Sequence, residues 1–316
     1  FLFGLGFETV VAEIKKGNIA SEKSFEKVGF KYESYSKEKD CKIFVYSKKW
    51  FCKKCGFFNP SSTATALVVQ RGRALILKRN QEPHRGAWDL PGGYVEWGEV
   101  PRDALLRELK EELRIDVELT YVKEFLGTDT LEGEIYPIIN HLFLAMPKGA
   151  VSLNEENSEY KWLPIKDLPD DIAFDSNKEI IAWAKANLSF DLDQVQLLIK
   201  QLDASAELDE WKLYNAVLDG YVSKKYDGAV LIGIGWIFLR RTMLRKQAVM
   251  EDMIVDDRYR GKGIGREILR DLIEWARKQG IDVVELTTNP GRVAANELYK
   301  SEGFILHETN HYLLKL

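Results

Sequence analysis

The sequence predicts a multidomain protein that combines α/β and α+β architecture. Its 316 residues exceed one average domain, and a hydrophobic content of 45% is enough to bury two or three cores. Two stretches, 92–113 and 261–278, each place a glycine-rich turn directly before an amphipathic helix. We therefore expect two separate domains of strands and helices around these stretches, preceded by a short N-terminal segment.

Composition and charge narrow the class of protein. A net charge of −4 and an isoelectric point near 5.8 argue against a nucleic-acid binder and against binding to anionic membranes. The sequence has no apolar run of 18 residues and no signal-peptide pattern, which predicts a cytoplasmic location. Three cysteines are an odd number, so we expect no disulfide scaffold. The chain begins with Phe1 rather than Met, as a fragment or a processed product does.

Residues 1–50 are expected to form a partial domain. Apolar patterns predict strands at 7–14 and 42–47 and a helix at 20–28. The stretch 10–30 resembles the closing half of a GNAT acetyltransferase. In that family a cofactor loop precedes this half, and none precedes it here, so we assign no catalysis to the segment.

A Cys-x-x-Cys-Gly pattern begins at Cys52. Cys52 and Cys55 have the spacing of a zinc knuckle, which supplies two of the four ligands of a structural Zn²⁺ site. Only Cys41 remains, and the sequence contains no second knuckle. The alternatives are a bound Zn²⁺ and a vestigial or incomplete site; a redox dithiol is disfavoured because no thioredoxin-like context surrounds the pair.

The central part of the chain alternates between strands and helices. Its pattern predicts a hairpin over 63–79 that turns at 70–73, strands at 117–125 and 135–143, and a closing helix at 177–187. Another helix begins at Pro101, whose missing N–H costs nothing in the first turn. Its apolar stripe consists of Leu105, Leu106, Leu109 and Leu113.

Three carboxylates lie on one face of this helix. Glu108, Glu111 and Glu112 stand at i, i+3 and i+4, where their charges repel unless a cation lies among them. Carboxylate oxygens favour Mg²⁺ or Mn²⁺. Gly92 and Gly93 let the backbone approach such an ion or its phosphate ligands, since neither carries a Cβ. The alternative is an acidic helix face exposed to water.

The spacing of the motif favours a cation site. The pattern Gly93-x5-Glu99-x7-Arg107-Glu108-Leu109-x-Glu111-Glu112-x-x-Ile115 resembles the Nudix box. Arg114 stands where the family has the glycine that ends the helix in a left-handed conformation. The resemblance covers 51–187, and within it the segment 159–164 is similar to the family's late strand. It implies an α/β/α sandwich with a mixed sheet, and hydrolysis of a nucleoside diphosphate linked to another moiety.

The same resemblance implies roles for individual residues. The implied metal ligands are Glu108, Glu111, Glu112 and the Gly92 backbone, with Glu99 as an outer partner. Arg107 could clamp one carboxylate. Arg79, Gly92 and Gly93 are candidates for substrate contact, and for Arg79 the alternative is a surface arginine. The catalytic general base stays open between Glu108 and a later glutamate, among Glu132, Glu134, Glu155, Glu156 and Glu159.

A change in composition at 188–193 opens the C-terminal domain, 188–316. Apolar patterns predict helices at 193–202, 211–221, 266–278 and 293–301, and strands at 229–239, 250–255, 283–288 and 312–316. A glycine-rich loop, Arg260-Gly261-Lys262-Gly263-Ile264-Gly265, precedes the helix at 266–278. Unpaired amides and the helix dipole favour an anion there, although a glycine-rich turn can also be a tight connection.

The loop spacing Arg-x-x-Gly-x-Gly resembles the coenzyme A pyrophosphate loop of GNAT acetyltransferases. That family has an α/β fold with a mixed, mostly antiparallel sheet. The resemblance implies Tyr299 as the catalytic general acid for the leaving thiolate and Glu251 as the general base; the alternatives are a half-buried helix tyrosine and a strand glutamate without a catalytic role. The implied acetyl-CoA contacts are Val255, Arg260, Gly261, Lys262, Gly263, Ile264, Gly265, Asn289 and Asn296.

We therefore expect a bifunctional enzyme with a Nudix pyrophosphohydrolase at 51–187 and a GNAT N-acetyltransferase at 188–316. The expected cofactors are Mg²⁺ or Mn²⁺ and acetyl-CoA, with Zn²⁺ open. The expected partners are a nucleotide-type small molecule and an amine acceptor, with no nucleic acid and no membrane. The alternative is that one module is a non-catalytic ligand-binding, regulatory or docking domain attached to a single active enzyme.

Overall fold

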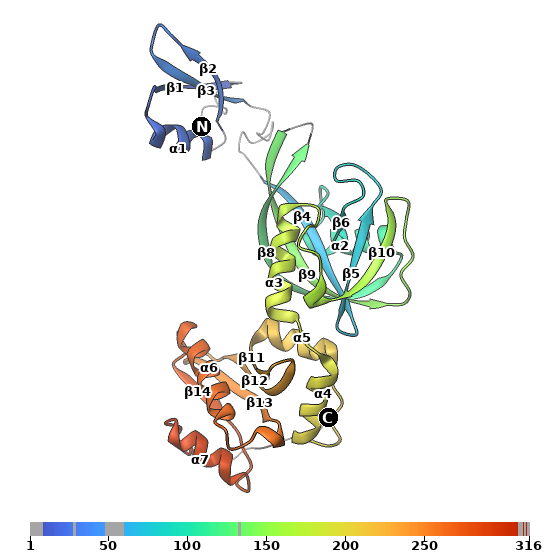
Figure 1. The fold of residues 1–316 in the computed structure, drawn as a ribbon, viewed down its shortest axis with the longest axis vertical. Helices are drawn as coiled ribbons and strands as arrows, with labels where there is room; N and C mark the ends of the chain where they lie inside the picture. The colour runs from blue at the N-terminus through green and yellow to red at the C-terminus, as the bar shows by residue number, and fades with distance from the viewer. Residues whose placement is uncertain are drawn as a thin grey trace.

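The computed structural model of the chain describes residues 9–27, 30–47, 60–131, 134–308, 312 and 314. Three groups of strands follow one another along the chain, each forming its own sheet (Figure 1). Among the described residues, no helix is both long and apolar enough to cross a membrane. Cys52 and Cys55 lie outside the described residues, so the zinc site stays a prediction.

The N-terminal unit is a three-stranded antiparallel sheet with one helix. Its strands are ordered β1-β3-β2, and Ile14, Cys41 and Phe44 are buried in it. Strand β2 was not predicted, because most of its side chains are exposed and it lacks an apolar alternation. The elements are β1 (Thr9–Lys15), α1 (Ile19–Lys27), β2 (Lys31–Ser36) and β3 (Cys41–Ser47).

The central domain is a mixed sheet with a helix on each face. The sheet has the order β10-β5-β4-β9-β8, with β6 beside β5 and β7 beside β4, and only β4 and β9 run parallel. The elements are β4 (Ser61–Gln70), β5 (Arg73–Arg79), β6 (Trp88–Asp89), β7 (Gly92–Tyr94), α2 (Pro101–Leu113), β8 (Asp116–Leu131), β9 (Glu134–Lys148), β10 (Asn157–Pro164), η3 (Ile165–Asp167) and α3 (Asp175–Leu188).

Alternating side chains of β4 and β5 explain the two layers of helices. Leu67 and Ile76 share a buried cluster with α3, whereas Val68 and Leu75 pack against the apolar stripe of α2. The sandwich with a mixed sheet is thus confirmed (Figure 1). The predicted hairpin is confirmed as well, because Gln70 pairs with Arg73 across the β4–β5 turn.

The two ends of helix α2 are formed by Pro101 and Arg114. Pro101 occupies its first turn, and Val100 provides no side-chain cap. At the other end, Arg114 adopts a left-handed conformation with φ 54°, and its N–H donates to the Lys110 carbonyl at 3.2 Å. Arg114 therefore terminates the helix in the conformation expected of a glycine, without changing where the helix ends.

The C-terminal domain is a four-stranded sheet of order β11-β12-β13-β14, in which only β13 and β14 run parallel. A mixed, mostly antiparallel sheet is therefore confirmed. The predicted helix at 211–221 ends at Asp219, and the next strand was missed. The elements are α4 (Leu192–Leu202), α5 (Glu210–Asp219), β11 (Gly220–Asp227), β12 (Val230–Arg241), β13 (Lys246–Val255), η4 (Asp257–Tyr259), α6 (Ile264–Lys278), β14 (Val283–Leu286) and α7 (Val293–Ser301). The predicted strand at 312–316 falls mostly outside the described residues.

The central and C-terminal domains share one hydrophobic core. Leu67 and Ile76 of the central sheet belong to the same buried cluster as Leu198 of α4, Tyr214 of α5 and Ile234 of β12. Polar contacts reinforce this join at the β4–β5 turn. There the Glu210 carboxylate accepts hydrogen bonds from the N–H groups of Arg71 and Gly72, at 2.6 and 2.7 Å.

Candidate active sites

Two of the predicted metal ligands pack against the glycine turn before α2. Glu112 is 9% exposed, and its carboxylate accepts hydrogen bonds from the Gly92 N–H at 3.0 Å and from Asn157 Nδ2 at 3.3 Å. A Cβ at position 93 would lie 2.4 Å from Glu108 Oε1. Gly93 therefore leaves the space that the Glu108 carboxylate occupies.

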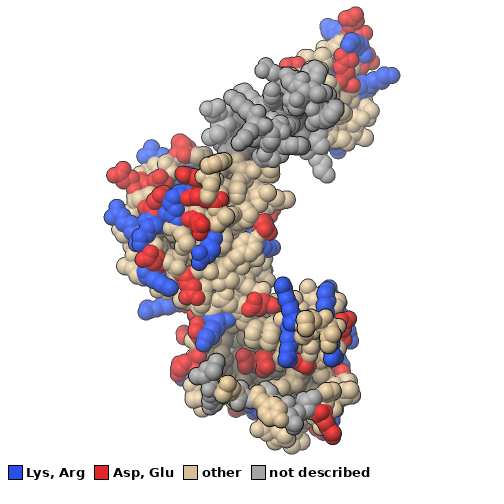
Figure 2. Space-filling view, turned by 180° about the vertical axis from the view of Figure 1, so that it is seen from behind, with Lys and Arg blue, Asp and Glu red and all other residues tan. Residues whose placement is uncertain are grey.

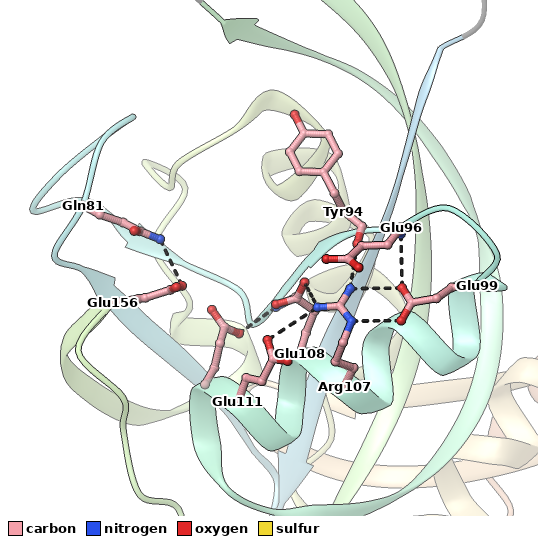
Figure 3. A network of polar contacts seen from close by, with 10 residues as sticks. Gln81, Tyr94, Glu96, Glu99, Arg107, Glu108, Glu111 and Glu156 are labelled. Atoms are coloured by element: carbon pink, nitrogen blue, oxygen red, sulfur yellow. Dashed lines mark hydrogen bonds and ion pairs between the residues drawn. The ribbon is translucent and has the colours of Figure 1, made fainter.

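Arg107 holds the carboxylates around it (Figure 3). Its Nε and Nη2 donate to the two oxygens of Glu99 at 2.9 and 3.1 Å, and its Nη1 donates to Glu108 Oε1 at 2.8 Å. Nη1 also lies 3.5 Å from Glu111. The predicted clamp by Arg107 exists, and its bidentate partner is Glu99 rather than one of the three helix ligands.

Burial perturbs the two inner carboxyl groups. It raises the pKa of Glu112 to about 8, and the neighbouring Glu108 and Asp89 charges add to this rise. Burial also raises the pKa of Glu108, against the opposing effect of Arg107, and the charges of Glu111 and Glu156 act in the same direction as burial. Both groups therefore lie where an added positive charge would stabilise their ionised forms.

The three predicted ligands do not converge on one point. Within the described ranges, no three or more His, Cys, Asp or Glu side chains are grouped so as to hold a metal ion. Glu108 and Glu111 face Arg107, which offsets their charges, while Glu112 faces Gly92 and Asn157. The assignment of these residues as metal ligands stays a prediction. The donors fit Mg²⁺ in chemistry, because they are hard oxygens with crowded negative charge.

The glutamates that were candidates for the general base are separated by the structure. Glu156 is the one whose charge acts on Glu108, and its carboxylate accepts a hydrogen bond from Gln81 Nε2 at 3.0 Å. Glu159 instead pairs with Lys78 and Lys161. The Glu155 carbonyl accepts from Asn80 Nδ2. Glu132 and the side chain of Glu134 lie outside the described part of the chain.

Arg79 is half-buried and pairs with a buried carboxylate. Its Nη1 donates to Asp89 Oδ2 at 3.0 Å, and its guanidinium lies 5.0 Å from the centre of the Phe174 ring. Asp89 is buried and also accepts from Asn177 Nδ2 at 2.7 Å. Burial raises the pKa of Asp89, and Arg79 opposes that rise.

A cavity of about 360 Å³ opens beside this network. It is lined by residues that include His84, Trp88, Thr128, Phe174 and Lys178. The His84 and Phe174 rings meet edge to face, with centroids 5.0 Å apart. His84, Asp89, Phe174 and Asn177 were not predicted as site residues from the sequence. The available signal was Asp89, a charged residue between the apolar residues Trp88 and Leu90.

In the C-terminal domain, the glycine-rich loop leads into the N-terminus of α6. Gly261 and Gly263 have φ values of 75° and 88°, which disfavour other residues. The Gly263 carbonyl accepts from the N–H groups of Arg266 and Glu267 and so caps the helix. Arg260 and Lys262 are exposed, and Arg260 Nε donates to the Val255 carbonyl at 3.3 Å. Ile264 and Gly265 form the first turn of α6.

The strand before this loop separates from its neighbour. β14 pairs with β13 only as far as Met250, and Asp252, with φ 48°, lies at an irregularity in the register with β12. The backbone of Val255 therefore pairs with β12 on one side and, within the described chain, with no strand on the other. Glu251 is half-buried just before this irregularity.

The remaining predicted residues lie at α7. Tyr299 is half-buried against the core of α6 and β13, and burial raises the pKa of its hydroxyl. Asn296 Nδ2 donates to the carbonyls of Asn289 and Arg292 at 3.2 and 3.0 Å. The Asn289 side chain accepts from the Gly291 N–H at 2.8 Å. Both asparagines thus stabilise the turn into α7, a structural task that the resemblance alone did not reveal.

Comparison with known families matches both signature regions. The NUDIX domain model matches residues 60–184, and the acetyltransferase (GNAT) family model matches residues 170–304. Neither match extends into residues 1–50, where the GNAT-like resemblance stays a prediction.

Individual relatives cover one region each. An ADP-ribose pyrophosphatase of Methanocaldococcus jannaschii is 28% identical over 129 residues, which are 39% of this chain and 73% of that protein. N-acetylaspartate synthetase of Rattus norvegicus is 29% identical over 140 residues, 44% of this chain and 41% of that protein. The chain thus spans less than half of the latter relative.

Solved structures divide in the same way. The MutT NUDIX hydrolase from Burkholderia pseudomallei has 30% identity and a TM-score of 0.36, covering 39% of this chain and 97% of that one. An acetyltransferase of Trypanosoma brucei has 23% identity and a TM-score of 0.34, covering 40% of this chain and 93% of that one.

Proposed function

Because the chain carries a NUDIX hydrolase domain and a GNAT acetyltransferase domain, we propose that it is a bifunctional enzyme. One domain hydrolyses the diphosphate of a nucleotide-type substrate, and the other transfers an acetyl group from acetyl-CoA to an amine. The observation that carries the hydrolase assignment is the crowding of Glu108 and Glu112 against Gly92 and Gly93.

In the hydrolase domain, Glu108, Glu111, Glu112 and the Gly92 backbone would hold Mg²⁺. When bound, the ion neutralises the diphosphate and lowers the pKa of an attacking water. Asn157 and the Gly92 N–H orient Glu112, and Arg107 orients Glu108. Glu156, next to Glu108, accepts the proton of the water as general base.

The cavity beside Arg79 accommodates the part of the substrate away from the diphosphate. His84, Trp88 and Phe174 present aromatic surface for a planar or ring-shaped group, and Lys178 adds a positive charge. A substrate that joins two such groups through a diphosphate fits this chemistry. ADP-ribose, which appears in the name of one relative, is therefore the first compound to test.

In the acetyltransferase domain, the backbone amides around Gly261 and Gly263 bind the pyrophosphate of acetyl-CoA at the N-terminus of α6. The pantetheine arm forms hydrogen bonds with the unpaired backbone edge of β13 at Val255, in the way that an added strand would. Glu251 takes the proton of the amine. Tyr299, which is protonated at neutral pH as any tyrosine with a pKa at or above about 10 is, donates a proton to the leaving thiolate.

The two assignments are tested on the full chain with one variant for each domain. Glu112→Gln should abolish Mg²⁺-dependent hydrolysis of ADP-ribose and leave the Kd for acetyl-CoA unchanged. Gly263→Val should weaken acetyl-CoA in calorimetry and leave hydrolysis unchanged. Hydrolysis that persists in the first variant, or acetyl-CoA affinity that persists in the second, would refute the respective assignment. A wild-type domain that binds its ligand without turnover would support the alternative of a non-catalytic module.

The visible face of the central and C-terminal domains carries charges of both signs. Figure 2 shows acidic and basic side chains interspersed over the visible face of the central and C-terminal domains.

A further inference from the structure

The loop between β13 and α6 is anchored at its first residue. Asp256 is only 4% exposed, so its charge requires partners. Its carboxylate accepts from the Arg258 N–H at 2.9 Å, from Arg258 Nε at 3.0 Å and from Arg258 Nη2 at 2.8 Å. Its own N–H donates to the Ile232 carbonyl on β12 at 2.9 Å. Asp256 thus fixes the short turn η4 to the sheet.

Gln201, in the last turn of α4, supplies a second anchor from outside the loop. Its Oε1 accepts from the Asp257 N–H at 2.9 Å, and its Nε2 lies 3.5 Å from Asp256 Oδ2. The two residues are 55 positions away from each other in sequence. Helix α4 is itself held in the core shared with the hydrolase domain, through Val195 and Leu198.

We infer that Gln201 and Asp256 are positioning residues for the acetyl-CoA site, and that they fasten the pyrophosphate loop to the helix joining the two domains. The inference rests on the proposed acetyltransferase function. Gly261 and Gly263 have no side chains that could fix their positions. Their backbone amides are therefore oriented toward the pyrophosphate only if the preceding residues 256–260 are held in place. The hydrolase domain then serves as part of the platform on which this loop is built.

The test compares two glutamines of the same helix in the full chain. Gln201→Met removes both contacts to the loop at nearly constant length. Gln196→Met is the matched control, because Gln196 makes the same kinds of bond elsewhere: it accepts from the Leu208 N–H at 2.6 Å and donates to the Ala206 carbonyl at 3.0 Å. Calorimetry measures the Kd of acetyl-CoA and of S-acetylpantetheine, which lacks the pyrophosphate.

We expect Gln201→Met to weaken acetyl-CoA by about tenfold, the effect of losing one well-formed hydrogen bond to the loop. Its affinity for S-acetylpantetheine, its kcat and its hydrolase activity should equal those of the wild type. Gln196→Met should bind acetyl-CoA as the wild type does. Asp256→Asn, which keeps the shape of the side chain but removes its charge, should also weaken acetyl-CoA selectively.

Three results would overturn the inference. The first is wild-type acetyl-CoA affinity in both Gln201→Met and Asp256→Asn. The second is equal weakening in the two glutamine variants, which would indicate a general effect on α4. The third is a wild-type chain that does not bind acetyl-CoA at all; this outcome would refute the proposed acetyltransferase function itself, and so it is distinguishable from the other two.

Discussion

Two adjacent glycines before α2 predict two different defects on substitution by alanine. At Gly93, a Cβ would lie 2.4 Å from Glu108 Oε1, at the free end of a flexible side chain that can move away. At Gly92, where φ is 143°, a Cβ would lie 2.2 Å from the Ala64 carbonyl oxygen and 2.9 Å from the Thr65 Cα. These are backbone atoms of β4, which cannot move without disturbing the sheet.

The expected magnitudes follow from these contacts. Gly93→Ala should change the free energy of unfolding by less than about 1 kcal/mol, since only a side chain is displaced. It should lower the kcat of Mg²⁺-dependent hydrolysis by about 100-fold, because a shift of about 1 Å in a catalytic group has that effect. Gly92→Ala should lose about 2 to 4 kcal/mol, from overpacking and from backbone strain.

Urea unfolding and steady-state hydrolysis of ADP-ribose measure the two effects. Gly149→Ala is the control for backbone strain alone, because Gly149 has φ 117° and no atom within 4 Å of its Cβ position. A Gly93→Ala variant with wild-type kcat would refute the placement of Glu108 at the reacting centre. Equal destabilisation by Gly92→Ala and Gly149→Ala would show that the clash with β4 is not a real constraint.

Three further predictions concern single side chains. In EDTA, the folded chain keeps a proton on Glu112 up to about pH 8, whereas the unfolded chain releases it near pH 4.5. The free energy of unfolding of the metal-free protein should therefore fall as the pH rises from 5 to 8. Urea unfolding at pH 5 and at pH 8 measures this change, and Glu112→Gln should remove the part that Glu112 contributes. Arg107→Met should lower kcat/KM for hydrolysis by about tenfold, because the carboxylates of Glu99 and Glu108 lose their common partner; unchanged kinetics would contradict this role. Tyr299→Phe should lower the kcat of acetyl transfer by about 100-fold at constant acetyl-CoA Kd, and a parallel loss of binding would indicate a structural role instead.

Local patterns predicted the elements that carry both sites. The apolar stripe and Pro101 located α2, and the turn at 70–73 located the hairpin, because these signals lie within one helix or one pair of strands. The missed strands were β2, β6, β7 and β11. The first is mostly exposed, the next two are only two and three residues long, and β11 follows α5 without a break. Periodicity is weak in all of these situations.

The arrangement of side chains within the sites was harder to predict from the sequence. The sequence predicted Glu108, Glu111 and Glu112 on one helix face, but it did not predict that the Arg107 guanidinium contacts two of these carboxylates. The contact of Asp89 with Asn177 joins residues 88 positions apart, and the local sequence around neither residue predicts it. Arg114 shows the opposite case, since the backbone adopts the expected left-handed turn even with an unexpected residue there.

The buried cluster common to both catalytic domains has a practical side. Leu67 and Ile76 of the central sheet belong to the same buried cluster as Leu198, Tyr214 and Ile234 of the C-terminal domain, so cutting the chain between the domains would expose apolar surface on both parts. We expect either domain, expressed alone, to expose a hydrophobic patch and to aggregate. Expressing either domain alone would require polar substitutions in that patch. Separating the two domains by one cut in the chain would therefore not give two soluble proteins.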